Sequence, residues 1–310
     1  MVVRIKAWFV ALMESYVIIA GLALIAGLLF SKQLLSLTFL STLMLQIIFF
    51  LSSLKIDLDE VKKSFTDVSS LLLVNVFMLI LLPFVVFYLV RLVSPELALP
   101  LMLLAAMPAG MTTPLLTEVV KGNVGYSLVL TVTTSLLAPL TIPFVLKVLV
   151  GATVNISFVD MLVKLIYVLV VPFILATIVK RYFHVQIKKS FFTFKPISLG
   201  LLGLLIAVLV AKSADQILGD INNFLYYLVI TVAFYIVLHI LGYYLMVWKN
   251  KKDRVTVTVS VTYMNFVLAI YLAVQYFNEP YVILPLVISI IPWALMLVPF
   301  SKVLNLSINK

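Results

Sequence analysis

Residues 107–114 read Met-Pro-Ala-Gly-Met-Thr-Thr-Pro and interrupt a strongly apolar segment of the chain. Proline removes a backbone donor and its ring clashes with the preceding turn, so a helix is expected to break here. Lipid cannot satisfy the carbonyls that such a break frees, and the break must therefore be packed in protein or line a wet cavity. Broken helices at membrane depth often form substrate and ion sites. The stretch therefore predicts a membrane-embedded site at an interrupted helix.

The composition of the whole chain indicates an all-α polytopic membrane protein. Of the 310 residues, 64% are hydrophobic and 11% are charged, and the mean hydropathy is +1.24. Apolar stretches of about 20 residues recur, which is the length that a helix needs to cross the hydrocarbon core. Ten spans with short loops are predicted, at residues 15–31, 35–54, 69–91, 97–118, 124–148, 158–180, 195–212, 223–247, 254–277 and 280–304.

The distribution of positive charge predicts the orientation of these spans. The net charge is +10, and with a cytoplasmic N-terminus 17 of the 22 lysines and arginines fall on the inner side. Such a bias is typical of membrane proteins, so both termini are expected to be cytoplasmic and the protein to lie in the plasma (cytoplasmic) membrane. The basic loops are short and flank the lipid bilayer, which argues against a nucleic-acid partner.

The number of spans predicts two inverted five-helix repeats, residues 1–152 and residues 153–310. An odd number of helices in each half forces the second half to enter the membrane upside down. The repeat is inferred from the helix count, because the two halves show no clear sequence similarity. The fourth helix of each half is unusual: span four holds the proline-bounded break, and span nine holds the polar residues Thr256, Thr258, Ser260, Thr262, Tyr263 and Asn265.

The hydroxyl residues of span nine permit two interpretations. Over residues 256–262 a threonine or serine alternates with valine, and this period of two would align the hydroxyls along an extended or unwound segment. Alternatively the helix is continuous and each hydroxyl bonds to a carbonyl one turn earlier. The segment contains no proline or glycine to decide the matter. Asn265 is expected to face the bundle interior, because its amide needs several hydrogen-bond partners.

Span five carries a polar stripe on one helical face. Ser127, Thr131, Thr134 and Ser135 are spaced at i, i+4, i+7 and i+8, so they share one side of the helix. Close packing against another helix is one explanation for such small residues. Because the stripe follows the break that offers Thr112 and Thr113, it is also a candidate wall of an ion or substrate site.

Residues 107–143, MPAGMTTPLLTEVVKGNVGYSLVLTVTTSLLAPLTIP, resemble the core motif of bile acid:sodium symporter family proteins, and the chain is similar to a divergent member. The shared elements are the Pro-x-Gly turn at Pro108 and Gly110, the Lys-Gly-Asn-Val loop at 121–124, and the Ser127–Thr131 pair. The resemblance implies a core domain that holds the ions, a panel domain that supports it, and a crossing of two discontinuous helices.

The resemblance also implies a set of site residues, which this chain preserves in part. The candidate sodium site consists of Thr113, Ser127, Thr131 and Ser260, and the candidate substrate contacts are Thr112, Pro114, Thr262 and Asn265. Pro114 replaces the family's asparagine, Ser260 its glutamate, and Met264 and Met78 two glutamines. Sodium prefers oxygen ligands and a buried cation needs compensating charge, so sodium coupling is expected to be weak or altered.

The acidic residues supply no obvious substitute for the missing glutamate. None of the 12 lies near the middle of a predicted span, and Glu118 is the nearest. Ion coupling usually recruits an intramembrane carboxylate. His239 in span eight is the one titratable group deep enough to carry a proton instead, although a lone membrane histidine more often serves packing.

These features predict an alternating-access secondary transporter of a small organic anion, and the family resemblance implies that this anion is bile-acid-like, pantoate-like or a keto acid. The positive ends of two half-helices at the breaks would favour an anion. The alternatives are an ion-independent or proton-linked facilitator or efflux carrier of the same architecture, and a non-transporting sensor. No enzyme motif is evident, no cofactor other than a sodium ion is expected, and the sequence does not indicate an oligomeric state.

Overall fold

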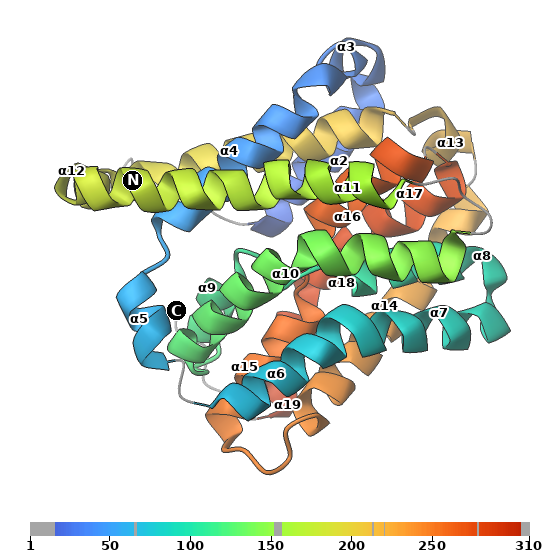
Figure 1. Ribbon diagram of the computed structural model, residues 1–310. Coiled ribbons are helices and arrows are strands. Elements are labelled where there is room, and N and C mark those ends of the chain that lie inside the picture. The colour runs from blue at the N-terminus through green and yellow to red at the C-terminus, as the bar shows by residue number, and fades with distance from the viewer. Residues whose placement is uncertain are drawn as a thin grey trace, which may run out of the picture. The chain divides into compact units, whose positions relative to one another are not determined.

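The structure is a computed structural model of the 310-residue chain, and it describes residues 16–64, 67–151, 157–212, 214–219, 221–277 and 279–304. All regular elements among these residues are helices (Figure 1). Both termini, and the predicted repeat boundary at 152–153, lie outside the described residues. The bounds are α2 Tyr16–Leu29, α3 Ser31–Leu35, η1 Thr38–Leu40, α4 Ser41–Leu54, α5 Leu58–Ser64, α6 Val68–Val76, η2 Phe77–Leu81, α7 Leu82–Val93, α8 Pro95–Ala105, α9 Thr113–Val119, α10 Val124–Val150, α11 Phe158–Leu165, η3 Ile166–Val170, α12 Val171–Ala211, α13 Ala214–Gly219, α14 Ile221–Tyr244, α15 Lys251–Thr262, α16 Phe266–Leu272, η4 Ala273–Phe277, α17 Pro280–Ile288, α18 Ile290–Leu295 and α19 Leu297–Val303.

Several of these helices are long and apolar enough to cross a membrane. Four qualify individually, and the pair Tyr281–Leu295 and Leu297–Val303, bent by 42°, qualifies jointly. The four are Val68–Val93, Val124–Val150, Phe158–Phe194 and Asn223–Tyr244. Five further apolar helices of 10–17 residues fall on the other predicted spans. The prediction of an all-α polytopic membrane protein is confirmed, whereas the ten-helix inverted repeat stays a prediction.

The connection predicted between spans six and seven, at residues 181–194, is helical rather than an open loop. Two helices meet within α12 across a kink at Phe183 (φ −122°, ψ 30°), and the green and yellow parts of α12 run in opposite directions (Figure 1). Residues 181–195 contain neither glycine nor proline and include several lysines and an arginine, which are good helix formers. This composition explains why the connection between the two spans is helical.

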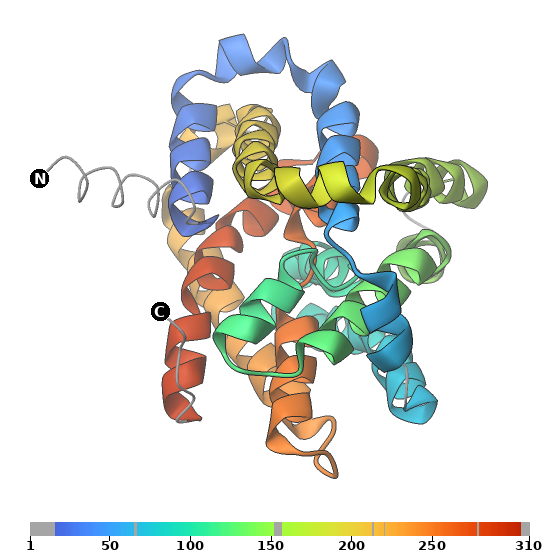
Figure 2. The ribbon, with the colours of Figure 1, turned by 90° about the vertical axis from the view of Figure 1, so that its left-hand side faces the viewer.

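The chain divides into two compact units, and the described parts of Met1–Lys55 and Val168–Ile221 form the first. Its long helix α12 packs against α2 and α4 (Figure 2). Gly27 lets α2 approach α12 closely, since a Cβ there would lie 2.7 Å from the carbonyl oxygen of Ala207. Against α4, the buried residues Leu54, Ala176, Ile187 and Phe194 form an apolar cluster. Burial of these apolar faces holds the unit together.

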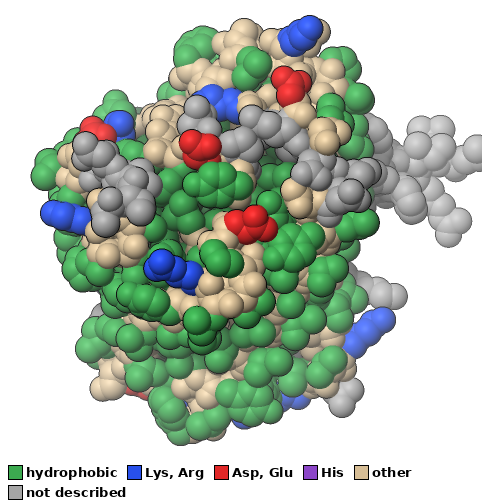
Figure 3. Space-filling model, turned by 90° about the vertical axis from the view of Figure 1, so that its right-hand side faces the viewer, with side chains coloured by type: hydrophobic (Ala, Val, Ile, Leu, Met, Phe, Trp, Pro, Cys, Tyr) green, Lys and Arg blue, Asp and Glu red, His purple; other side chains and the backbone are tan. Residues whose placement is uncertain are grey.

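The described parts of Ile56–Tyr167 and Asn222–Lys310 form the second unit, which contains both interrupted helices discussed below. Its core includes α8, where residues from Leu101 to Ala106 are at most 1% exposed, and α15, where Val255 to Thr262 are equally buried. By contrast, apolar residues such as Leu92, Val163 and Val229 are more than half exposed. The face shown in Figure 3 carries many hydrophobic side chains, with acidic and basic side chains among them. Exposed apolar side chains such as Leu92, Val163 and Val229 are expected where a protein faces lipid.

Candidate functional site at two broken helices

The predicted break in span four is confirmed. Helix α8 ends at Ala105, and α9 begins at Thr113. Pro108 cannot donate a backbone hydrogen bond, and Pro114 occupies the first turn of α9, where a missing N–H costs nothing. The sequence therefore both ends one helix and starts the next within eight residues.

Span nine is also broken, but at a different place from the hydroxyl alternation. Thr256 and Thr258 lie in α15 and donate to the carbonyls of Lys252 (2.9 Å) and Arg254 (2.8 Å). An extended conformation for residues 256–262 is therefore wrong, and these hydroxyls follow the helical interpretation. The interruption comes next, at residues 263–265, after which α16 begins at Phe266.

The two breaks pair with one another through their backbones. The Gly110 amide donates to the Tyr263 carbonyl (2.9 Å), and the Asn265 amide donates to the Pro108 carbonyl (2.9 Å). Between these bonds, Ala109 and Met264 form an isolated antiparallel bridge. Each broken helix thus satisfies backbone groups that the other frees, which permits non-helical backbone at membrane depth.

Close approach at this crossing depends on Gly110. A Cβ at this position would lie 2.8 Å from the carbonyl oxygen of Tyr263, well inside ordinary contact. The described residues include no glycine with positive φ, so space rather than backbone conformation requires glycine here. Because Gly110 has no side chain, the Pro-x-Gly turn can pack directly against the second break.

Side chains at the two breaks reinforce the crossing. Thr113 is fully buried and its hydroxyl donates to the Tyr263 carbonyl (3.2 Å). Asn265 is half-buried and its Oδ1 accepts from the Leu268 amide (3.1 Å), so it caps the N-terminus of α16. Its Nδ2 has no acceptor among the described residues and remains available to a ligand. Thr112 and Pro114, at the start of α9, are both half-buried.

The polar stripe of α10 faces inward, as the sequence predicted. Ser127, Thr131, Thr134 and Ser135 are between 0% and 8% exposed. The Thr131 hydroxyl donates to the Ser127 carbonyl (2.9 Å), and the Thr134 hydroxyl accepts from the Ala109 amide (3.2 Å). The stripe therefore contacts the first break directly, at a residue that lies 25 positions earlier in the chain.

Two further hydroxyl residues, which were not predicted for the site from the sequence, join α9, α10 and α15. Thr117 in α9 donates to the Ser127 hydroxyl (3.1 Å), and Thr256 in α15 accepts from the Asn123 amide (2.7 Å). Thr117 follows Thr113 by four residues, so helical spacing alone would have placed both on the same face of α9. The role of Thr256 depends on a contact across 133 residues and leaves no local signal.

Some buried hydroxyls near the crossing have no partner. Ser260 and Thr262 are 0% exposed, and neither Oγ atom has a hydrogen-bond partner among the described residues. The Ser135 Oγ atom on α10 is also buried without a hydrogen-bond partner among the described residues. A buried hydroxyl left unpaired costs about 1–3 kcal/mol. These oxygens are therefore the groups that a bound ion or substrate would most readily satisfy.

The candidate ion ligands form a neutral set. Thr113, Thr117 and Thr131 already donate their protons to other oxygens, which leaves their lone pairs for a cation. Across the described residues no group of three or more His, Asp or Glu side chains gathers to hold a metal ion. Hydroxyl and carbonyl oxygens suit sodium chemically, but without a carboxylate they do not compensate its charge.

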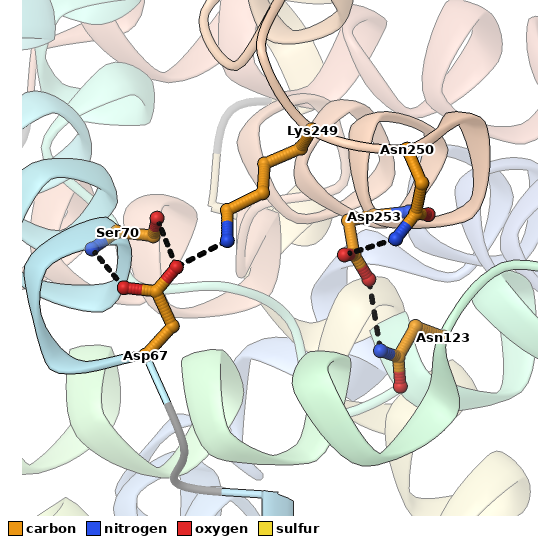
Figure 4. Close-up of polar contacts among 6 residues, drawn as sticks. All are labelled: Asp67, Ser70, Asn123, Lys249, Asn250 and Asp253. Atoms are coloured by element: carbon orange, nitrogen blue, oxygen red, sulfur yellow. Dashed lines mark hydrogen bonds and ion pairs between the residues drawn. The ribbon is translucent and has the colours of Figure 1, made fainter.

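Charged and amide side chains fix the helix ends on one side of this site (Figure 4). Asp67 caps α6 by accepting from the Ser70 amide, and it pairs with Lys249. The hydrogen bond from Lys249 is the main reason that the pKa of Asp67 lies well below its usual value. Asn123 caps α10 and its Nδ2 donates to Asp253 (2.8 Å). Asn250, which caps α15, also donates to Asp253 (2.7 Å). The capping residues of α10 and α15 are thus linked through Asp253, and the cap of α6 is joined to Lys249, which directly precedes the cap of α15.

His239 lies beside the second break, with partners on both ring nitrogens. Nδ1 lies 2.8 Å from the Tyr235 carbonyl, and Nε2 lies 3.3 Å from the Tyr263 hydroxyl. The ring also packs against Phe300, with centroids 4.7 Å apart. A neutral imidazole that donates at Nδ1 and accepts at Nε2 satisfies both contacts, as a packing histidine would. A proton-carrying role for His239 stays a prediction.

Comparison with known proteins supplies an independent line of evidence. No curated protein matches the sequence significantly. The model of the Sodium Bile acid symporter family matches residues 42–220, which is 179 of 310 residues and more than half of the chain. The matched segment includes the first break and the hydroxyl stripe of α10, and it ends before the second break. The chain therefore belongs to the Sodium Bile acid symporter family.

Proposed function

We propose that this protein is a secondary transporter that moves a small organic anion across the membrane by alternating access, with weak sodium coupling. Family membership supports a transporter of the sodium-coupled, bile-acid type and gives no support to an enzyme. The finer proposal concerns this chain's own residues: the substrate is bile-acid-like, pantoate-like or a keto acid, and sodium binds through hydroxyl and carbonyl oxygens alone.

The observation that carries this proposal is the paired crossing of the two breaks. Its backbone bonds, from Gly110 to Tyr263 and from Asn265 to Pro108, hold two helix starts at one place inside the second unit. The N-termini of α9 and α16 direct the positive ends of their helix dipoles toward the break. The amides of Thr113, Phe266 and Leu268 already donate within the protein, so an organic carboxylate bound there would gain the helix dipoles and a hydrogen bond from Asn265 Nδ2, which donates to no described residue. We place the substrate contacts at Thr112, Pro114, Thr262 and Asn265.

We assign sodium to Thr113, Ser127, Thr131 and Ser260. The first three lie on adjoining elements, because Thr117 bonds to Ser127 and links α9 to α10. Ser260 brings a buried oxygen without a partner from α15. A neutral ligand set binds a cation less tightly than one that includes a carboxylate. Weak coupling therefore follows from the missing acid.

Thermal unfolding of the detergent-purified protein in NaCl and in KCl at equal ionic strength tests the sodium assignment. A ligand that binds only the folded state stabilises it by RT ln(1 + [L]/Kd), so sodium should raise the melting temperature specifically. Thr131→Ala should abolish that rise. Thr133→Ala is the matched control, because Thr133 also donates to a carbonyl four residues earlier on α10 but is outside the buried stripe. No sodium-specific rise at a few hundred millimolar would contradict the assignment and favour an ion-independent carrier.

Transport itself is tested in proteoliposomes loaded with unlabelled candidate anions. Uptake of the labelled anion by counterflow is expected to fall to background in Thr113→Ala and Asn265→Ala while both variants still fold. Binding of an anion without any flux would instead identify a non-transporting sensor. Undiminished uptake in both variants would remove the site assignment.

We further propose that the ten predicted spans form inverted repeats over residues 1–152 and 153–310, with both termini cytoplasmic. The two compact units support a panel formed by the first and a core formed by the second, which holds both breaks. The chain contains no cysteine, so single cysteines can report topology directly. Ser64→Cys should react with an impermeant maleimide from the cytoplasmic side and Ser157→Cys from the outside. Equal labelling from one side would contradict the proposed orientation.

A further inference from the structure

An apolar groove runs between α14 and α19 in the second unit. It has a volume of about 370 Å³, within the range of ligand-binding cavities. Its lining includes Ile236, Ile240 and Tyr243 from α14 and Pro299, Phe300 and Val303 from α19. Ile240 is 53% exposed and Val303 is 79% exposed, so the groove is open along one side. Helix α14 is apolar enough to span the membrane, and only 33% of its most apolar segment is buried inside the protein. The open side of the groove is therefore expected to face lipid.

One end of the groove carries positive charge. The Arg254 guanidinium lies 3.9 Å from the centroid of the Tyr243 ring and 5.7 Å from that of Tyr244, and both tyrosines line the groove. The Lys251 ammonium donates to the carbonyl of Leu304 (2.8 Å), another lining residue. Two cations are therefore held at the same end, where α14 and α19 both terminate.

Arg254 retains free hydrogen-bonding capacity at this end. Its Nε donates to the Tyr243 carbonyl (3.0 Å), and no carboxylate among the described residues pairs with its guanidinium. The nearby carboxylate of Asp253 is already bonded to Asn123 and Asn250. The terminal nitrogens of Arg254 are thus available to an anion, and a guanidinium matches phosphate oxygens particularly well.

We propose that this groove binds an anionic phospholipid, with one acyl chain between α14 and α19 and the phosphate at Arg254. An acyl chain suits a long apolar groove that is open to the hydrocarbon, and the negative headgroup suits the cations at its end. The residues that follow α14 also carry the exposed Lys252, so the local charge favours an anionic over a zwitterionic lipid. The site goes beyond the proposed transport function and does not depend on it.

The groove connects directly to the crossing of the broken helices. His239 lines it, and His239 Nε2 contacts the hydroxyl of Tyr263. The carbonyl of the same tyrosine accepts from Gly110 and Thr113 at the break. A lipid in the groove therefore packs on the side chains that support the crossing, and its binding stabilises the folded second unit.

Native mass spectrometry of the purified full-length protein with phosphatidylglycerol and phosphatidylcholine, supplied at equal concentration with matched acyl chains, tests the proposal. Retained phosphatidylglycerol is expected to exceed phosphatidylcholine by about fivefold for each cation that contacts the headgroup. Ile240→Trp and Val303→Trp each fill the groove and should remove most of the bound lipid. Val237→Trp is the matched control on α14, because Val237 is similarly exposed (49%) but does not line the groove.

The headgroup contact is tested separately from the acyl-chain contact. Arg254→Ala should reduce the preference for phosphatidylglycerol about fivefold, whereas Arg254→Lys should keep most of it. Lys188→Ala, which removes an exposed charge from α12, should leave the preference unchanged. Melting curves without added lipid establish that each variant is folded; the two groove substitutions replace exposed side chains, so either one suffices if the other is unstable.

Three results would overturn the proposal. Equal retention of the two lipids by the unaltered protein would show that the site does not select an anionic headgroup. Unchanged lipid binding in folded Ile240→Trp and Val303→Trp would place the lipid elsewhere. A dimer that both groove variants convert to monomer would show that a second copy of the chain occupies the groove.

Discussion

Replacement of Gly110 by alanine tests whether the two broken helices are held together as closely as the structure shows. The added Cβ would lie 2.8 Å from the Tyr263 carbonyl oxygen and 3.5 Å from that of Met264. Contacts of 3.4 Å are the ordinary lower limit, so the two breaks must separate by about 0.6 Å. Both contacted atoms belong to the backbone and cannot move aside as a flexible side chain would.

The energetic cost follows from the contacts at the crossing. Overpacking of a rigid interior typically costs about 1–3 kcal/mol. The same displacement stretches the 2.9 Å bond from Gly110 to Tyr263 toward 3.5 Å, beyond good hydrogen-bond geometry, at a further cost of about 1 kcal/mol. We therefore expect Gly110→Ala to lower the free energy of unfolding by about 2–4 kcal/mol.

The free energy of unfolding is measured by titrating the purified protein with sodium dodecyl sulfate and following tryptophan fluorescence. Gly200→Ala is the matched control: Gly200 lies within α12, and a Cβ there meets no atom within 4 Å. This control should be neutral or stabilise the protein by up to about 1 kcal/mol, because alanine favours helix over glycine. If Gly110→Ala changes the free energy by less than about 0.5 kcal/mol, the steric argument for the crossing is refuted.

Three further substitutions have defined outcomes. The hydrogen bond from Lys249 depresses the pKa of Asp67 in the folded protein. The ionised carboxylate therefore stabilises the fold fully above the unfolded pKa near 4, and this stabilisation declines as the pH falls below that value. Melting temperatures at pH 5 and pH 3 should accordingly differ less in Asp67→Asn than in the unaltered protein. Gly242→Ala should lower the melting temperature, since its Cβ would lie 2.7 Å from the Cα of Thr258 and force α14 away from α15; an unchanged melting temperature would contradict that close approach. Lys121 has φ 56°, and Lys121→Gly should raise the free energy of unfolding by up to about 1 kcal/mol, whereas a decrease would show that the lysine side chain contributes more than its backbone strain costs.

The first break was predictable because its cause is local. Pro108 and Pro114 act on the residues immediately around them, and any chain with this spacing loses helical hydrogen bonds there. The same holds for the inward stripe of α10, since Ser127 and Thr131 share a face through helical periodicity alone. Apolar stretch length likewise indicated a membrane fold without any knowledge of contacts.

The second break was left open by the sequence because its partner lies elsewhere in the chain. Residues 263–265 contain no proline or glycine, and the bonds from Asn265 to Pro108 and from Gly110 to Tyr263 span about 150 positions. The alternation at 256–262 suggested an extended segment, yet Thr256 and Thr258 bond within their own helix. The connection predicted before Pro196 is helical and kinked at Phe183, because residues 181–195 contain no glycine or proline and consist largely of residues that a helix accepts.

The sequence alone determined that this protein is a helical membrane protein with a broken fourth span, a buried hydroxyl stripe and no intramembrane carboxylate, because each of these depends on composition or on spacing within one segment. Only the tertiary structure decided where the second helix breaks, that Thr117 and Thr256 join the site, and which hydroxyls remain unpaired. These features depend on backbone groups satisfying one another across distant parts of the chain, and a backbone amide or carbonyl is the same in every non-proline residue. The identity of an amino acid therefore does not indicate which distant partner its backbone amide or carbonyl binds.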